Sequence, residues 1–275
     1  MNCNNEEFAA YREWLNGHEK SKLSIEKNIR DIVKFRQFYG KSLETITKQD
    51  ILNYKEHLIK RYKSASVNSY LISVNNFLKF TDRDSLRVKT IRIQRRNSLD
   101  YVLDEKEYAA LVECAKNWKN RWLYYLIRTL ASSGIRVGEL QYITDSMLET
   151  GKTNAYNKTK MREIILPKNL CMELRKYCEE RHITGIIFHG KQANTLIDKA
   201  HIWRELKRLA KAAGVPVEKV HAHSFRHFFA KQFLSEYHDI VDLADILGHN
   251  SIETTRIYTR TSRQEKQTRI DGLNL

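Results

Sequence analysis

The chain contains very few residues that interrupt helices. Two prolines and ten glycines occur among its 275 residues. Proline removes a backbone hydrogen-bond donor and clashes with the preceding helical turn, and glycine loses more conformational entropy on folding than any other residue. Their scarcity favours a helix-rich fold, and together with a β-hairpin pattern in the second half of the chain it leads us to expect a fold that is mainly α with a small β-sheet. A chain of this length can form one large domain or two ordinary ones.

Residues 1–85 have the pattern of a small helical bundle. Apolar residues recur every three or four positions in 24–39 and again in 66–80, as they do on one face of an amphipathic helix. Between these stretches, Thr47 and Asp50 have the spacing of a capping box at the start of a helix. Three or four such helices pack around a core of their own, so 1–85 is predicted to be a separate domain.

Residues 86–98 differ in composition from the bundle. They contain no acidic residue, no helical apolar period and five basic residues: Arg87, Lys89, Arg92, Arg95 and Arg96. This pattern predicts an inter-domain linker, although its alternation also fits a short strand. A basic linker can lie against a phosphate backbone, where Arg92, Arg95 and Arg96 would contact DNA; the alternative is a solvated basic loop.

Residues 99–275 are predicted to form a second domain of the α+β class. One helix ends at Gly134, and glycine is the usual residue just past a helix C-terminus. Residues 154–167 predict a β-hairpin, with a turn around 158–160 and a strand that contains Ile164 and Leu166. The remainder of this domain has mainly helical patterns.

The charge of the chain indicates a polyanionic partner. Lys and Arg outnumber Asp and Glu by 48 to 33, which gives a net charge of +15. A surface this basic attracts nucleic acid, although ribosomal and membrane-surface proteins share the property. The sequence contains neither an apolar run long enough to span a bilayer nor a secretory signal, and its four cysteines form no CxxC pair. We therefore expect a cytoplasmic protein that does not associate with membranes.

Four short stretches combine residue types that suit phosphate chemistry. They are GIRVGEL with Arg136 and Glu139, NKTKMR with Lys158, Lys160 and Arg162, HSFRH with His223, Arg226 and His227, and LGHNSIETTRIY with His249 and Tyr258. Tyr258 follows the histidine of the Leu-Gly-His stretch by nine residues. In this order, the set resembles the pattern of the tyrosine recombinases of the phage-integrase family, and the resemblance spans essentially the whole chain.

The resemblance implies a fold and an activity. The N-terminal bundle would be a SAM-like core-binding domain, and 99–275 would be the catalytic domain with a C-terminal exchange tail. The enzyme would be a site-specific recombinase that cleaves and rejoins DNA strands through a covalent 3′-phosphotyrosine, in integration, excision, inversion or resolution. It would act as a homotetramer on double-stranded DNA, be a monomer or weak oligomer when free, and associate with the bacterial nucleoid.

The residue types agree with attack on a phosphodiester. The transition state spreads negative charge over the phosphate oxygens, to which arginine can donate two hydrogen bonds at once. Arg136 and Arg226 are the candidates for this role. Tyr258 is the candidate nucleophile, and it needs a proton acceptor because a phenol is almost wholly protonated at pH 7. The resemblance supports His223 as that acceptor and His249 as a donor to a phosphate oxygen.

A lysine of the hairpin is expected to protonate the departing 5′ oxygen. We favour Lys158, and Lys160 is the alternative, because the spacing of either lysine from Pro167 departs from the common family form. Lys160 and Arg162 are otherwise expected to contact DNA. Glu139 lies three residues after Arg136 and is expected to orient a neighbouring side chain.

His221, His223 and His227 also have a spacing that could bring three imidazoles onto a metal ion. We expect no metal, because no cysteine or carboxylate completes the set and Arg226 lies among the histidines. His227 is instead expected to pack or to donate a hydrogen bond. No phosphate-binding glycine loop is present, so no cofactor is expected. Two other functions stay open: a type IB topoisomerase, and a non-catalytic DNA-binding accessory protein.

Overall fold

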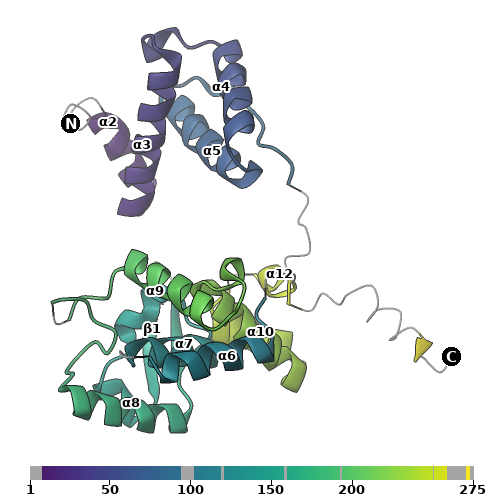
Figure 1. Cartoon of the computed structure of the whole chain (residues 1–275). Coiled ribbons are helices and arrows are strands. Elements are labelled where there is room, and N and C mark those ends of the chain that lie inside the picture. The colour runs from purple at the N-terminus through teal and green to yellow at the C-terminus, as the bar shows by residue number, and fades with distance from the viewer. Residues whose placement is uncertain are drawn as a thin grey trace. The chain divides into compact units, whose positions relative to one another are not determined.

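The protein is described here by a computed structural model. It covers residues 8–93, 102–118, 121–157, 160–192, 194–249, 251–258 and 271–272, with the backbone alone for Asn157 and Lys160. The chain divides into two compact units, Met1–Arg95 and Arg96–Leu275 (Figure 1). Among the described residues, no helix is long and apolar enough to cross a membrane.

The first unit is built from helices. Its elements are α2 (Ala9–Gly17), α3 (Lys22–Tyr39), α4 (Lys48–Arg61), α5 (Ser64–Phe80) and the short 3-10 turns η1 (Leu43–Thr45) and η2 (Asp84–Leu86). The capping box predicted for α4 is present, because the Asp50 amide donates to Oγ1 of Thr47 and the Thr47 amide donates to Oδ2 of Asp50. This pair satisfies two backbone donors that the first helical turn leaves free.

The core of the first unit consists of the apolar faces that the sequence pattern predicted. Its fully buried side chains include Ile32, Phe35, Ile51, Val67, Leu71, Val74 and Leu78. They come from α3, α4 and α5, which pack on one another. The three helices therefore bury their apolar stripes in a shared interior.

Part of the predicted linker packs on this first unit. The Asn75 amide group donates to the carbonyl of Val88 and its Oδ1 accepts from the Val88 amide, and Asn68 forms the same pair of bonds with Ile91. Val88 is buried in the same core. Residues 87–93 therefore lie along α5 without forming a strand. Arg92 is exposed, and the other two expected DNA contacts in this stretch, Arg95 and Arg96, lie outside the described residues.

The second unit combines helices with one antiparallel hairpin. Its elements are α6 (Glu105–Lys116), α7 (Trp122–Ser133), η4 (Val137–Tyr142), η5 (Ser146–Glu149), β1 (Lys152–Asn157), β2 (Lys160–Ile165), α8 (Lys168–Arg181), α9 (Lys199–Ala212), η6 (Val217–Lys219), α10 (Ala222–Tyr237), α11 (Ile240–Leu247) and α12 (Ile252–Thr255). The predicted hairpin is confirmed: β1 pairs with β2 so that Asn157 faces Lys160 and Ala155 faces Arg162.

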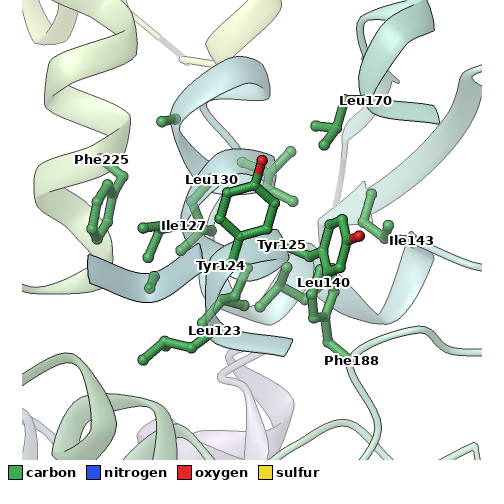
Figure 2. Packing of buried hydrophobic residues seen from close by; sticks show 14 of the residues in the cluster. Leu123, Tyr124, Tyr125, Ile127, Leu130, Leu140, Ile143, Leu170, Phe188 and Phe225 are labelled. Carbon is green, nitrogen blue, oxygen red and sulfur yellow. The ribbon is translucent and has the colours of Figure 1, made fainter. Parts of the chain in front are cut away.

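Helix α7 lies at the centre of the second unit. Figure 2 shows its side chains Leu123, Ile127 and Leu130 inside a cluster to which Phe225 of α10 also contributes. The helix ends at Gly134, whose φ is 61°, in the left-handed region that glycine adopts without strain. A Cβ at this position would lie 2.6 Å from Cδ1 of Phe229 and 2.8 Å from Cδ2 of Leu247. The end of α7 thus lies directly against α10 and the end of α11.

Candidate active site

The candidate residues converge where α7 and α11 end beside α10. Arg136 comes two residues after Gly134 and immediately precedes η4. Its Nη2 donates to the carbonyl of Gly248 at 3.4 Å, which joins the end of α7 to the loop after α11. The guanidinium is one-third exposed, so it can still reach a ligand from solvent.

Arg226 is almost completely buried and is held by main-chain oxygens. Its residue is 1% exposed. Nη1 donates to the carbonyl of Gly134 at 2.5 Å, and Nη2 donates to the carbonyl of Leu247 at 2.7 Å. The pKa of Arg226 is lowered to about 10 by burial and by the neighbouring charges of Arg136 and Arg162, so the group stays cationic at pH 7.

The Nε of Arg226 is buried and has no hydrogen-bond partner among the described residues. A buried donor without a partner costs about 1–3 kcal/mol. Proteins keep such a group where strain or function compensates for it. An anion that reached this nitrogen would accept its hydrogen bond and neutralise the charge of the guanidinium.

His249 contacts Arg226 in a way that determines its tautomer. Nε2 of His249 lies 3.0 Å from Nη2 of Arg226, which can only donate. Nε2 must therefore accept, and the ring proton lies on Nδ1, which donates to Oγ1 of buried Thr255 at 2.7 Å. Burial and the charges of Arg226 and Arg136 lower the pKa of His249 to about 4, which agrees with a neutral ring.

The hydroxyl of Tyr258 lies 2.7 Å from Nδ1 of His227. The Tyr258 ring packs on a small apolar cluster that contains Ala230, Leu243 and Leu247. Burial raises the pKa of Tyr258, and the charges of Arg226 and Arg136 act in the opposite direction. The phenol is therefore protonated at pH 7, but the two guanidinium groups are close enough to stabilise its anion.

His223 lies beside His227 rather than on Tyr258. The two imidazole rings meet edge to face with their centroids 4.7 Å apart, and His223 is exposed. In the described part of the chain, the histidine that bonds to the Tyr258 hydroxyl is His227, which the sequence pattern had assigned to packing or donation. Both histidines lie on α10, four residues apart, and from sequence alone either ring can face the phenol.

Glu139 and Arg162 form a buried ion pair, and the contact of Arg162 with DNA expected from the sequence stays a prediction. Nη2 of Arg162 donates to Oε2 of Glu139 at 2.5 Å, and both side chains are less than one-tenth exposed. Glu139 also accepts from the amide of Arg136 at 2.7 Å and from its Nη1 at 3.2 Å. Although burial opposes ionisation, these bonds to Arg162 and Arg136 hold the pKa of Glu139 below its usual value. Glu139 thus bonds to two arginines, and its expected role in orienting a side chain of the site stays a prediction.

The hairpin lysines are only partly described. Lys158 lies outside the described residues, and Lys160 begins β2 opposite Asn157. His221 caps α10, because its Nδ1 accepts from the Ser224 amide at 3.1 Å. Within the described ranges, no group of three or more histidine, cysteine, aspartate or glutamate residues is arranged to hold a metal ion.

Sequence reasoning did not identify a basic, aromatic face on α9. Trp203 is 56% exposed on this helix, and Arg204, Arg208 and Lys211 are exposed beside it. The Nζ of Lys199, at the start of α9, lies 3.8 Å from the Cβ position of Gly138, two residues after Arg136. The signal available in the sequence was the run of basic residues between the apolar positions of this amphipathic helix.

Comparison with known proteins gives one family match and many relatives. The Phage integrase family matches residues 101–265, more than half of the chain. The tyrosine recombinase XerC of Rickettsia bellii (strain OSU 85-389) is 28% identical over 269 residues, which cover 90% of this chain and 88% of the relative. The tyrosine recombinase XerA of Pyrococcus furiosus is 28% identical over 283 residues, which cover 98% of this chain and 93% of the relative.

Solved structures share the fold. A crystal structure of a lambda integrase tetramer bound to a Holliday junction covers 93% of this chain and 78% of that chain, with a TM-score of 0.72 and 18% sequence identity. An identity this low supports a common fold alone. That fold is mainly helical and carries a small sheet, as predicted from the sequence.

Proposed function

The chain belongs to the phage integrase family, and from this premise we propose that it is a site-specific tyrosine recombinase that cleaves and rejoins DNA strands. One observation carries the mechanism proposed below. Three separate stretches of sequence supply Arg136, Arg226, His249 and Tyr258, which meet at one place. There a buried nitrogen of Arg226 has no partner within the part of the chain that the structure describes.

The two arginines stabilise the scissile phosphate. The phosphate enters beside Arg226, whose free Nε donates to one oxygen, and Arg136 donates to another from the solvent side. These cations are fixed before the substrate arrives, because Glu139 and main-chain carbonyls already orient them. Such preorganised donors stabilise the charge that develops in the transition state more than water can.

Tyr258 is the nucleophile. Its oxygen forms a bond to phosphorus, the bond from phosphorus to the 5′ oxygen breaks, and a 3′-phosphotyrosine results. The phenol proton passes first to neutral His227, which already bonds to the hydroxyl, and exposed His223 exchanges that proton with solvent or substrate. Lys158 protonates the departing 5′ oxygen, with Lys160 as the alternative from the same hairpin.

The covalent intermediate conserves the energy of the phosphoester. A 5′-hydroxyl of a second strand can attack the phosphotyrosine and reverse the step, so strands are exchanged without a nucleotide cofactor. His249 supports the phosphate from beside Arg226, because its Nε2 accepts from Nη2 and helps to hold the guanidinium in place. A proton taken up by Nε2 when the phosphate binds would let the imidazole donate to a phosphate oxygen.

Double-stranded DNA is the substrate, and four copies of the chain assemble on it. The lambda integrase tetramer on a Holliday junction has the same fold, which supports this assembly. Residues 1–85 serve as the core-binding domain, 86–98 as the linker, and 99–275 as the catalytic domain with an exchange tail that docks on a neighbouring copy. The basic face of α9 contacts the duplex, and the protein works in the cytoplasm at the bacterial nucleoid.

Capture of the covalent adduct tests this function. The substrate is a duplex that carries the recombination site, taken from DNA that flanks the gene, with a nick shortly 3′ of the cleavage position. Cleavage releases the short fragment that carries the new 5′-hydroxyl, and its loss traps the enzyme on the 3′ phosphate. Wild-type protein should form an adduct stable to denaturant, and Tyr258→Phe should bind the duplex but form none. A wild type that binds this DNA tightly without an adduct would favour the non-catalytic accessory protein. Rapid relaxation of supercoiled plasmid without a site would favour the topoisomerase.

A further inference from the structure

We propose that Arg162 is a positioning residue of the recombinase site, a role that rests on the function proposed above. From β2, its guanidinium donates three hydrogen bonds: Nε and Nη2 to the two oxygens of Glu139, and Nη1 to the carbonyl of Ile246. All three lie in the interior of the second unit. Arg162 therefore links the lysine-bearing hairpin to Glu139 on one side and to the end of α11 on the other.

The contact with Glu139 connects Arg162 to Arg136. The same carboxylate accepts from the main chain and the side chain of Arg136. Without Arg162, the buried carboxylate would keep Arg136 as its one cationic partner among the described residues, and the stronger pairing would draw the Arg136 guanidinium inward. Arg162 bonds to both carboxylate oxygens, so the side chain of Arg136 can stay one-third exposed, in a position to meet a phosphate.

The contact with Ile246 fixes the loop that carries His249. Ile246 lies in the last turn of α11, where carbonyls have no partner within the helix. Gly248 follows with a φ of +62°, and a Cβ there would lie 2.4 Å from Cδ of Arg162. The arginine stem thus lies directly beneath Gly248. Any shift of this stem moves the loop whose carbonyls at Leu247 and Gly248 bond to Arg226 and Arg136.

The geometry requires arginine in particular. A lysine has one compact charge and cannot bond to both carboxylate oxygens and a third acceptor in the plane of a fork. The neighbouring strand also suits a long side chain at this position. Arg162 lies opposite Ala155 of β1, which is small and buried, and this leaves room for the arginine stem. The hairpin, the loop and Arg136 therefore move as one unit.

The test measures cleavage and binding separately. Single-turnover adduct formation on the nicked duplex gives the rate, and fluorescence anisotropy on an intact duplex gives the Kd, for Arg162→Gln, Arg162→Lys, Glu139→Gln and the double variant Glu139→Gln, Arg162→Gln. Arg175→Gln is the matched control, because Nη2 of Arg175 donates to the carbonyl of Leu148 elsewhere in the same unit.

We expect Arg162→Gln to slow cleavage about 100-fold, the usual effect of a small misplacement of catalytic groups, with a Kd within about twofold of wild type. Arg162→Lys should recover part of the rate. The double variant should be no slower than Arg162→Gln alone, since removing the unpaired carboxylate removes the force that displaces Arg136. Arg175→Gln should cleave at the wild-type rate.

A wild-type cleavage rate for Arg162→Gln would overturn the proposal. If the rate is unchanged but binding is weaker, Arg162 is a DNA contact and not a positioning residue. If Arg162→Gln unfolds below the assay temperature, the cleavage rate of the folded Arg162→Lys variant is used instead. A wild-type rate for Arg162→Lys would refute the positioning role of Arg162. Failure of the wild type to form any adduct is a separate outcome that removes the proposed function itself.

Discussion

The hydroxyl of Tyr258 and Nδ1 of His227 lie 2.7 Å apart within one chain. The same chain supplies Arg136 and Arg226, whose charges act on that hydroxyl. The proposed nucleophile thus lies near the proposed phosphate-binding cations of its own chain. Nδ1 of neutral His227 can accept the phenol proton from this position.

The first prediction concerns the two histidines of α10. His227→Ala should slow single-turnover adduct formation about 100-fold, because a positioned proton acceptor typically contributes a factor of that order. His223→Ala should slow adduct formation less, because His223 does not contact the Tyr258 hydroxyl. The measurement is the rate of adduct formation across pH 5 to 9. Full activity in His227→Ala together with none in His223→Ala would show that the proton goes to His223 directly.

The second prediction concerns acid stability. The pKa values of His227 and His249 both fall from 6.5 to about 4 on folding, chiefly through burial. Between these values the unfolded chain binds more protons than the folded chain, so the free energy of unfolding must decrease as pH falls from 6.5 towards 4. Urea unfolding at pH 7.0, 5.5 and 4.5 measures this.

The double variant His227→Gln, His249→Gln provides the control for this effect. Its second unit should lose less stability over the same pH interval, because two of the groups that resist protonation are gone. Identical pH profiles for wild type and double variant would contradict the assignment of these histidines as the acid-sensitive groups.

The third prediction compares two glycines. Gly248→Ala introduces a Cβ 2.4 Å from Cδ of Arg162, whereas Gly214 has a similar φ of +68° and nothing within 4 Å of its Cβ position. Gly214→Ala should cost about 1–2 kcal/mol of unfolding free energy, the backbone strain alone. Gly248→Ala should cost about 1–3 kcal/mol more through overpacking. Equal losses in urea unfolding would mean that the arginine stem is free to move.

The fourth prediction concerns Thr255. Its Oγ1 accepts the ring proton of His249 and so keeps Nε2 directed at Arg226. Thr255→Val removes the acceptor at nearly constant volume, and we expect a cleavage rate about tenfold lower, in line with the loss of a partner that orients a functional histidine. Thr255→Ser should retain the wild-type rate. A slow serine variant would point to packing rather than to the hydrogen bond.

The fifth prediction concerns DNA binding by α9. Arg204→Ala and Lys211→Ala should each weaken binding for every duplex tested and reduce the slope of log K against log salt by about one. Lys176→Ala on α8, also an exposed lysine of the second unit, is the control and should leave the slope unchanged. An unchanged slope in all three variants would remove α9 from the DNA interface.

Local sequence signals predicted the elements of the fold well. The capping box at Thr47, the helix end at Gly134 and the hairpin before Pro167 each depend on residues within a few positions of one another, and all three are present. The motif residues Arg136, Arg226, His249 and Tyr258 also converge. Their chemical roles stay predictions until the variants above are measured.

Longer-range relationships could not be read from the sequence. Arg162 and Glu139 lie 23 residues apart, with η5 and β1 between them, and their pairing depends on how the hairpin packs beside η4. The orientation of α10 about its axis decides whether His223 or His227 meets Tyr258. The docking of Val88 and Ile91 depends on two asparagine side chains of α5, Asn75 and Asn68, each of which bonds to one of these two backbone groups. In each case the deciding contact is tertiary.

The two oxygens that secure Arg226 belong to the peptide groups of Gly134 and Leu247. Every amino acid supplies such an oxygen, so no single exchange of a side chain can delete either acceptor. What would disturb this anchorage is a change in the course of the chain, such as an inserted or lost residue near one of these two turns. Many side chains around the site can therefore be substituted in evolution without loss of these two hydrogen bonds, provided that the lengths of the two turns are kept.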